Sequence, residues 1–220
     1  MTRDLQSLRE RYDRGVLRRA DLAADPIEQF GHWWDEWMGV PRYDAAACVL
    51  ATAGADGTPT ARYVLCRGFD ERGFELYTNQ ESRKARDLRD NPRAALVFGW
   101  LEENRQVRVE GPVSLIEDDV ADAYWASRPR GSQLGGWASD QSEVLASRDE
   151  LDRRRAEVAE RFGGEDDGDP IPRPPFWGGY RVGLDRVEFW QGRADRLHDR
   201  FEYRRDEHQP DRWRIARLSP

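Results

Sequence analysis

Residues 46–69, AACVLATAGADGTPTARYVLCRGF, decide the fold because they hold two short apolar runs on either side of a tight turn. The first run, at 46–53, has the length and composition of a β-strand. The turn contains Asp56-Gly57, a dipeptide that strongly favours a hairpin between antiparallel strands. The second run, at 62–69, is predicted to be the returning strand. An antiparallel β-sheet therefore begins here.

The sequence on both sides extends this hairpin into a larger structure. Upstream, Asp25 followed by Pro26 predicts the start of a helix over 26–39, and segment 2–20 has the pattern of a weak amphipathic helix. Downstream, the apolar patterns predict strands at 74–78, 94–100, 106–115, 180–191, 198–204 and 213–218, and helices at 82–90, 117–127 and 147–162. We therefore expect a mainly β protein, an antiparallel barrel with flanking helices, formed by residues 1–220 as a single domain.

The composition is that of a folded, acidic protein. The 220 residues include 9 Trp, 7 Tyr and 8 Phe, enough large apolar side chains for a core. The 35 basic and 42 acidic residues give a net charge of −7, which argues against nucleic acid or an anionic membrane as a partner. Cys48 and Cys66 belong to no metal-binding motif, so no metal site is predicted. With no apolar leader and no run of membrane-spanning length, we expect a cytoplasmic protein.

A first candidate site is Ser82-Arg83-Lys84, which opens a helix directly after a strand. Free N–H groups at a helix start favour an anion, the adjacent cations add charge, and the serine hydroxyl adds a donor. Lys84 is the only lysine in the chain. The pattern fits a phosphate monoester, although it also fits an ordinary serine cap followed by solvated basic residues.

Arginines in the second strand are further candidates. Arg62 lies near its start and Arg67 near its end. In a regular strand these positions face opposite sides, so a bulge or the strand end must intervene if both reach one ligand. Each also fits a surface charge.

Two later segments carry the remaining candidates. A period of two places Arg196, His198 and Arg200 on one face of a strand, where two fixed cations flank a titratable imidazole. Tyr124 precedes a predicted loop that carries Arg128 and Ser132, groups able to hold a second phosphate. A structural histidine and an ordinary polar loop are the alternatives.

Two phosphate-type sites in one acidic protein imply a phosphorylated cofactor together with a phosphorylated substrate. The chain has neither a P-loop nor a dinucleotide-binding glycine fingerprint, which argues against ATP or NAD in their usual modes. FMN is a phosphorylated cofactor that β-barrels bind.

Blocks along nearly the whole chain resemble one known family. They include Arg62-Tyr63-Val64-Leu65, Tyr77-Thr78-Asn79, Ser82-Arg83-Lys84-Ala85, Ser127-Arg128-Pro129-Arg130-Gly131-Ser132-Gln133, Glu188-Phe189-Trp190-Gln191-Gly192 and Arg196-Leu197-His198-Asp199-Arg200-Phe201. In order and spacing these blocks resemble the pyridoxine (pyridoxamine) 5′-phosphate oxidase family. The resemblance implies an antiparallel, Greek-key type split β-barrel that forms a homodimer with FMN at the interface.

The resemblance also implies roles for individual residues. Catalysis would fall to Arg196 and His198. The FMN-binding positions would be Arg62, Tyr63, Val64, Leu65, Cys66, Arg67, Tyr77, Thr78, Arg83, Lys84, Gln106, Gln141, Ser142, Trp190 and Arg200. The substrate-binding positions would be Arg9, Tyr12, Arg67, Tyr124, Arg128, Ser132, Arg196, Leu197 and His198, with residues 1–20 as a mobile segment that closes over the substrate.

The reaction that the resemblance implies is oxidation of pyridoxine or pyridoxamine 5′-phosphate to pyridoxal 5′-phosphate. A hydride would pass from substrate C4′ to flavin N5, and O2 would then reoxidise the flavin and yield H2O2. Arg67 departs from the lysine common in the family, and arginine is larger and planar. The alternatives are a phenazine-type or other flavin oxidase of the same superfamily and a flavin-binding split-barrel protein without catalysis.

Overall fold

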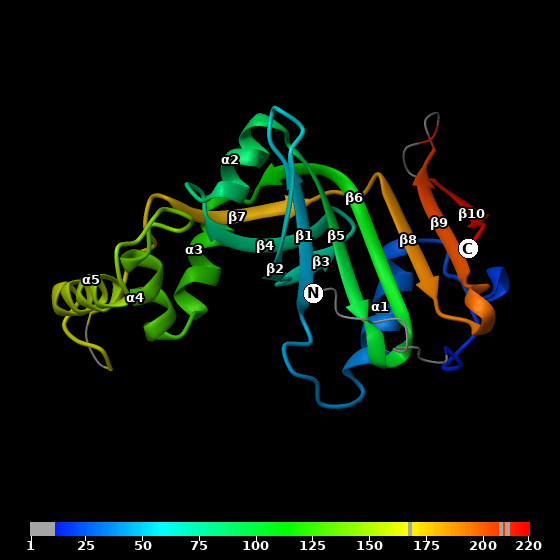
Figure 1. Ribbon diagram of the computed structural model, residues 1–220, viewed down its shortest axis with the longest axis horizontal. Helices are drawn as coiled ribbons and strands as arrows, with labels where there is room; N and C mark the ends of the chain where they lie inside the picture. Colours follow the sequence, from blue (N-terminus) through cyan, green and yellow to red (C-terminus); the bar gives the residue numbers. More distant parts are fainter. Residues whose placement is uncertain (1–11, 167–168, 207–208, 210–211) are drawn as a thin grey trace, which may run out of the picture.

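The computed structural model describes residues 12–166, 169–206, 209 and 212–220 (Figure 1). Their centre is a ten-stranded antiparallel sheet. Seven strands follow the order β10-β9-β8-β6-β5-β1-β2, and β7 joins β4 and β3 to the far end of β6. The strands are β1 (Ala47–Ala53), β2 (Pro59–Leu65), β3 (Gly68–Asp70), β4 (Gly73–Asn79), β5 (Arg93–Trp100), β6 (Arg105–Leu115), β7 (Trp177–Val182), β8 (Arg186–Gln191), β9 (Asp199–Arg205) and β10 (Trp213–Leu218).

The long strand β6 gives the sheet its curl. Its first part pairs with β5 and β8, whereas Val113–Leu115 pair with β7. Strand β6 thus changes its pairing partners from β5 and β8 to β7 along its length, and the sheet curls into a half-barrel. The predicted mainly β, antiparallel architecture with flanking helices is confirmed.

Helices cover the open sides of the sheet. They are α1 (Pro26–Met38), α2 (Arg83–Asp90), α3 (Asp118–Ser127), α4 (Arg130–Ala138) and α5 (Arg148–Arg161), with short 3-10 turns η1 (Arg19–Asp21), η2 (Leu101–Glu103) and η3 (Ala194–Arg196). Asp25 caps α1 as predicted, because its carboxylate accepts the Ile27 N–H. Phe30 of α1 is fully buried and packs edge-on against Phe74 and Phe98. Helix α1 therefore fills the curve of the sheet, while α3–α5 extend to one side (Figure 1).

The predicted strand at 62–69 is wrong in its bounds. Strand β2 begins earlier, at Pro59, and ends at Leu65. The Cys66 N–H still bonds to the Ala46 carbonyl, directly before β1, but the Arg67 N–H bonds to the Glu75 carbonyl of β4. The chain changes partner between these two residues, and β3 then pairs with β4. This break lets the sheet turn the corner.

Three other predictions also need correction. The strand predicted at 180–191 is two strands, β7 and β8, separated by a turn at 183–185 that bonds to β6. Helix α4 replaces the loop expected after Arg128. It forms despite three glycines because Leu134 is buried against α3 and α5. Residues 12–18 are not helical, and the rest of the helix predicted at 2–20, with Arg9, lies outside the described residues.

Candidate active site

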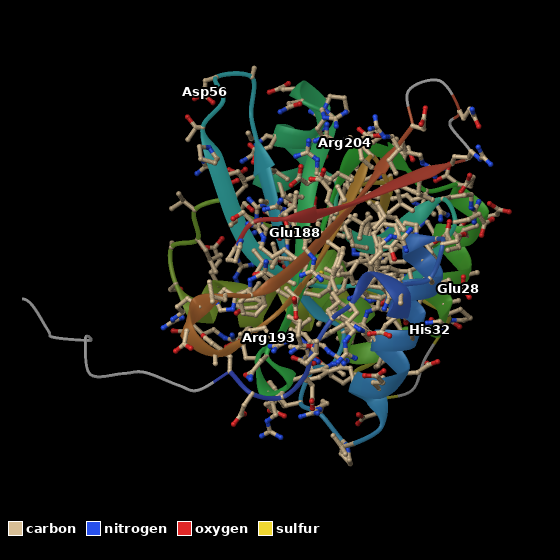
Figure 2. The ribbon with its side chains drawn as sticks, turned by 90° about the vertical axis from the view of Figure 1, so that its right-hand side faces the viewer. Glu28, His32, Asp56, Glu188, Arg193 and Arg204 are labelled. Carbon is tan, nitrogen blue, oxygen red and sulfur yellow. The ribbon has the colours of Figure 1, made fainter. Side chains whose placement is uncertain are left out.

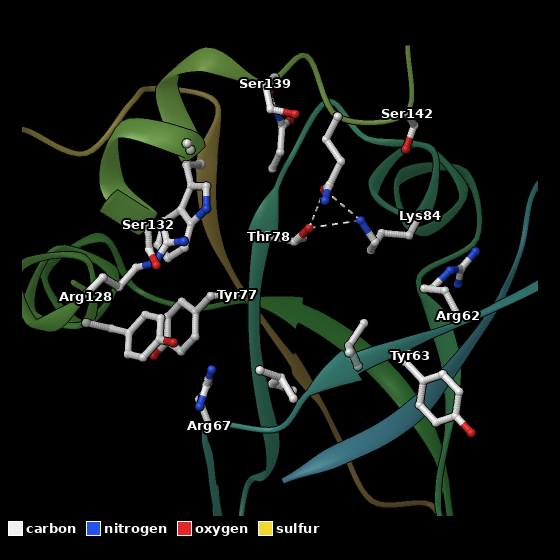
Figure 3. A pocket seen from close by; sticks show the side chains of 18 of the residues that line it. Arg62, Tyr63, Arg67, Tyr77, Thr78, Lys84, Arg128, Ser132, Ser139 and Ser142 are labelled. Carbon is white, nitrogen blue, oxygen red and sulfur yellow. Dashed lines mark hydrogen bonds between the residues drawn. The ribbon is translucent and has the colours of Figure 1, made fainter. Parts of the chain in front are cut away.

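A cavity of about 1220 Å³ lies where β2, β4 and α2 meet α3 and α4 (Figure 3). Small-molecule sites usually measure about 300–1,000 Å³, so this one has room for a cofactor and a substrate together. Many of the predicted residues line it: Arg62, Tyr63, Val64, Leu65, Arg67, Tyr77, Thr78, Arg83, Lys84, Tyr124, Arg128, Ser132, Gln141 and Ser142. The structure therefore brings both predicted phosphate sites to one cavity.

Lys84 is the central cation on one side of the cavity. Its side chain is buried, and its Nζ donates to the Thr78 hydroxyl, the Ser82 hydroxyl and the Gln141 Oε1 at 2.9–3.0 Å. All three acceptors are neutral. Burial, reinforced by the charge of Arg62, lowers the pKa of Lys84 to about 8. A buried ammonium without an acidic partner is a ready binding group for an anion.

Two arginines complete this cationic side. Arg62 Nη1 donates to the Leu50 carbonyl at 3.0 Å and to the Thr52 hydroxyl at 2.8 Å. Arg83, in the first turn of α2, is exposed, and its side chain forms no hydrogen bond or ion pair with the described residues. The predicted extra donor from Ser82 is wrong, because its hydroxyl donates to the Asn79 carbonyl. Helix α2 thus lacks a side-chain cap, and its first N–H groups have no side-chain acceptor in the described part of the chain.

Arg128 forms the cationic group on the other side. Its guanidinium carbon lies 4.8 Å from the ring centroids of both Trp125 and Trp177. Burial lowers the pKa of Arg128, and its Nη1 has no hydrogen-bond partner among the described residues. Gly136 leaves the space for this packing, since a Cβ there would lie 2.8 Å from Trp125 and 3.3 Å from Arg128 Nη1. A buried donor without an acceptor is the second place where the cavity favours an anion.

Aromatic rings form the wall beside Arg128. Tyr77 and Tyr124 stack with centroids 4.0 Å apart, and Trp177 continues the stack at 5.7 Å from Tyr77. Trp177 is a pocket residue that the sequence analysis did not select. The sequence signal that could have found it is the run Phe176-Trp177-Gly178-Gly179. Glycine at position 179 lets the Tyr77 ring pack closely against the strand, since a Cβ there would lie 2.8 Å from that ring.

The change of partner after β2 explains how Arg62 and Arg67 reach the same cavity. Position 67 falls beyond the strand, so strict alternation no longer applies to it. Arg67 is exposed, and its side chain forms no hydrogen bond or ion pair with the described residues. Cys66, by contrast, does not line the cavity. It is buried, its thiol donates to the Gly68 carbonyl, and burial raises its pKa to about 11.

The other predicted residues gather elsewhere on the chain. Gln106, Trp190 and Arg200 are neighbours across β6, β8 and β9. None of them lines the cavity of the same chain. Arg200 binds both carboxylate oxygens of Glu188 and donates to the Ser219 carbonyl, so its guanidinium is already engaged.

His198 lies in the turn between β8 and β9, the turn in which Figure 2 labels Arg193. Its Nδ1 accepts the Arg193 N–H at 3.1 Å, which places the proton of the neutral ring on Nε2. The ring packs against Trp190, with centroids 4.5 Å apart, and against Tyr12 at 5.6 Å. Burial lowers the pKa of His198, and the charges of Arg196 and Arg200 lower it further. The imidazole is therefore neutral near pH 7.

The predicted strand placement of Arg196 and His198 is wrong. Strand β9 begins at Asp199, and Arg196 belongs to η3. Asp195 and Arg196 adopt left-handed backbone conformations, with φ of 56° and 63°. The Arg196 guanidinium lies 5.2 Å from the Tyr12 ring centroid, and Leu197 is 69% exposed. A turn, not strand alternation, groups these side chains.

Comparison with known proteins gives the family of this chain. A family described as pyridoxamine 5′-phosphate oxidase matches residues 42–162, and one described as the C-terminal dimerisation region of pyridoxine 5′-phosphate oxidase matches residues 177–220. The chain belongs to the pyridoxamine 5′-phosphate oxidase family. Both matched regions contribute strands to one sheet.

Relatives cover the chain almost completely. A pyridoxine/pyridoxamine 5′-phosphate oxidase of Rubrobacter xylanophilus is 54% identical over 99% of this chain and 97% of its own length. One from Burkholderia multivorans is 51% identical over 98% and 99%. The solved structure of PhzG from Burkholderia lata 383, in complex with tetrahydrophenazine-1-carboxylic acid, is 30% identical, with a TM-score of 0.83 over 93% of this chain and 98% of that one.

A fourth similarity concerns the fold alone. An FMN-binding protein of Nostoc punctiforme, related to pyridoxamine 5′-phosphate oxidase, has a TM-score of 0.69 at 19% identity, covering 90% of this chain and all of that one. The expected split-barrel fold is confirmed. Among the described residues, no helix is both long and apolar enough to cross a membrane.

Proposed function

We propose that this protein is an FMN-dependent oxidase that converts pyridoxine 5′-phosphate and pyridoxamine 5′-phosphate to pyridoxal 5′-phosphate, with O2 as acceptor and H2O2 as second product. One observation carries the proposal. A single cavity has the buried Lys84 on one side and the half-buried Arg128, with its buried Nη1, on the other, and neither cation has an acidic partner among the described residues (Figure 3). Two separate anion sites in one cavity fit a phosphorylated cofactor and a phosphorylated substrate.

The residues fit FMN at the side near α2. Arg62, Arg83 and Lys84 would hold its phosphate, and Thr78 and Gln141 already position the Lys84 ammonium. When bound, FMN supplies the two-electron chemistry that no amino-acid side chain provides. The chain itself binds and orients the reactants and controls protons.

The substrate phosphate would bind on the opposite side. Arg128 Nη1 and the exposed Ser132 hydroxyl offer donors, and the Tyr77–Tyr124 stack offers a flat wall. Arg67 adds charge to this side of the cavity. These groups hold the substrate by its phosphate, so they set affinity more than turnover.

We infer that a second copy of the chain completes the site. Arg196 and His198 do not line the cavity of their own chain, and they precede β9, inside the C-terminal region that matches a dimerisation family. In a homodimer they would face the cavity of the partner. His198 would then offer its Nε2–H to the substrate, with Arg196 as a fixed cation beside it.

The chain is proposed to act as one domain in the cytoplasm, with its N-terminal segment closing over the substrate. Tyr12 supports this role, since its ring contacts His198 and Trp190 and lies under Arg196. Residues 1–11 lie outside the described part of the chain.

The similarity to PhzG favours one alternative, oxidation of a reduced phenazine carboxylate. The two candidates differ in whether the substrate carries a phosphate. We would assay the purified protein with FMN for aerobic turnover of both vitamin phosphates, following pyridoxal 5′-phosphate and H2O2, with a tetrahydrophenazine carboxylate in parallel. Matched formation of both products from the phosphates supports the proposal. Turnover of the phenazine alone would overturn it.

A further inference from the structure

A polar cluster of Asp87, Thr52 and Thr60 lies against Arg62, and of these three residues Thr60 also lines the cavity. Its acid is Asp87, on the second turn of α2, with a side chain only 12% exposed. Asp87 Oδ2 accepts the hydroxyl of Thr52 at 2.7 Å and that of Thr60 at 2.8 Å. Thr52 and Thr60 are directly opposite each other on β1 and β2. The cluster thus joins α2 to the hairpin that carries Arg62.

Counting protons fixes the direction of each hydrogen bond. A threonine hydroxyl has one proton, and both hydroxyls donate theirs to Asp87. Their oxygens therefore offer lone pairs to Arg62, which donates through Nη1 to Thr52 and through Nη2 to Thr60. The Asp87 carboxylate therefore acts on Arg62 indirectly, because it leaves both threonine hydroxyls as acceptors for the guanidinium.

The same count shows what Arg62 has left. Of its five N–H groups, Nη1 uses two, for Leu50 and Thr52, and Nη2 uses one, for Thr60. Among the described residues, the Nε–H and the second Nη2–H have no partner. These two groups lie on the same edge of the planar guanidinium and form the fork that binds two oxygens of a phosphate.

The charge of Asp87 is secured by its surroundings. Burial raises its pKa, but the Thr52 and Thr60 hydrogen bonds and the charges of Arg83 and Arg62 outweigh this and hold the pKa below its usual range. Asp87 is thus ionised at neutral pH. Its carboxylate lies 3.9 Å from Arg62 Nη2, close enough to favour one orientation of the guanidinium.

We propose that Asp87 is a positioning residue for the cofactor phosphate: through Thr52 and Thr60 it turns the free Nε/Nη2 edge of Arg62 toward the anion. The inference rests on the proposed function and adds to it. Helix α2 then serves the phosphate twice, directly through Arg83 and Lys84 and indirectly through Asp87. Asp87 does not line the cavity, yet it sets the orientation of Arg62, which does.

The test compares two flavins that differ by the phosphate alone. FMN and riboflavin are titrated against the full-length apoprotein, and quenching of flavin fluorescence gives both dissociation constants. Asp87→Ala should weaken FMN about tenfold, the effect of losing one partner of a charged hydrogen-bonding group, and change riboflavin less than about twofold. Thr52→Val and Thr60→Val should behave alike. Asp90→Ala is the control, because Asp90 is exposed on the same helix and its side chain forms no hydrogen bond or ion pair with the described residues.

Each outcome decides the matter. Equal losses for both flavins would mean that Asp87 only anchors α2, and no loss would mean that Arg62 needs no positioning; either overturns the inference. If thermal melting shows that Asp87→Ala is not folded, the same comparison is made with the two threonine variants, which leave the helix sequence unchanged. A wild-type protein that binds neither flavin refutes the proposed function itself. A wild-type protein that binds FMN while the variants do so equally well refutes only the role of Asp87.

Discussion

The cationic side of the cavity near α2 and the turn between β8 and β9 are built in opposite ways. Near α2, Arg62 and Lys84 extend from regular elements and are held by neutral oxygens of the same chain. In the turn, Arg196 sits on left-handed backbone and His198 is held by a backbone N–H and two aromatic rings. The first region lines a cavity, and the second lies apart from it on the same chain (Figure 1).

This difference teaches how the proposed work is divided. A phosphate site needs fixed donors, which a helix start and a paired strand supply without rearrangement. The groups that act at the reacting carbon must approach from another direction, and an unusual backbone is a common device for aiming them. One chain therefore holds the ligands, and the turn of a second chain is proposed to act on them.

The largest expected effect comes from the turn. Replacing His198 by alanine should lower kcat for pyridoxine 5′-phosphate by about 10²–10⁴, the usual contribution of a positioned proton-transfer group, with FMN content unchanged. Steady-state kinetics and the flavin absorbance of the purified variant measure both.

His32→Ala is the matched control for this variant, since His32 is exposed on α1 (Figure 2). It should match the wild type. A His198→Ala enzyme with kcat close to that of the wild type would show that the turn has no part in turnover. That result would contradict the proposed division of roles between the two regions.

The next effect belongs to the substrate side of the cavity. Replacing Arg128 by alanine should raise KM for the phosphorylated substrate by about 10²-fold, because a charge-assisted bond to phosphate contributes about 1.5–3 kcal/mol. The value of kcat should stay nearly constant. Arg148→Ala, which removes an exposed arginine from α5, is the control. A lower kcat at unchanged KM would contradict the assignment of Arg128 to phosphate binding.

The smallest effect concerns pH. The pKa of Lys84, lowered mainly by burial and also by Arg62, is about 8, so the ammonium that attracts phosphate is present below pH 8 and is lost above it. FMN affinity should therefore be highest near pH 7, about half of that at pH 8, and fall at higher pH by up to about tenfold per pH unit.

Fluorescence titration of the apoprotein with FMN across pH 7–9.5 measures this slope. Lys84→Arg stays charged throughout the range and should remove the slope, and riboflavin binding should show none. Parallel pH profiles for the wild type and Lys84→Arg would contradict a titrating role for Lys84.

Local signals made much of the fold predictable. Asp56-Gly57 marked the first hairpin, and Asp25-Pro26 marked α1, because turn and cap chemistry act within a few residues. The break after Leu65 was not predictable, since it depends on β4 offering a new partner at Glu75. Helix α4 was missed for a similar reason: its glycines disfavour a helix until Leu134 and Gln133 are buried.

The site shows the same division. The spacing of Ser82, Arg83 and Lys84 was enough to place two cations together at the start of α2, where Arg83 and Lys84 line the cavity. The grouping of Arg196 with His198 was predicted from strand alternation, yet a left-handed turn produces it. Asp87 gave no signal, because its partners Thr52 and Thr60 come from a hairpin far away in sequence.

Complementation between two defective chains tests the central claim most directly. Differently tagged His198→Ala and Arg128→Ala chains are co-expressed, and activity is measured at a substrate concentration far below the raised KM of Arg128→Ala. If the turn of one chain serves the cavity of the other, each heterodimer has one intact site, and random pairing restores about a quarter of wild-type activity. Activity no greater than the sum of the two parent variants would place both residues in the site of a single chain and contradict the account.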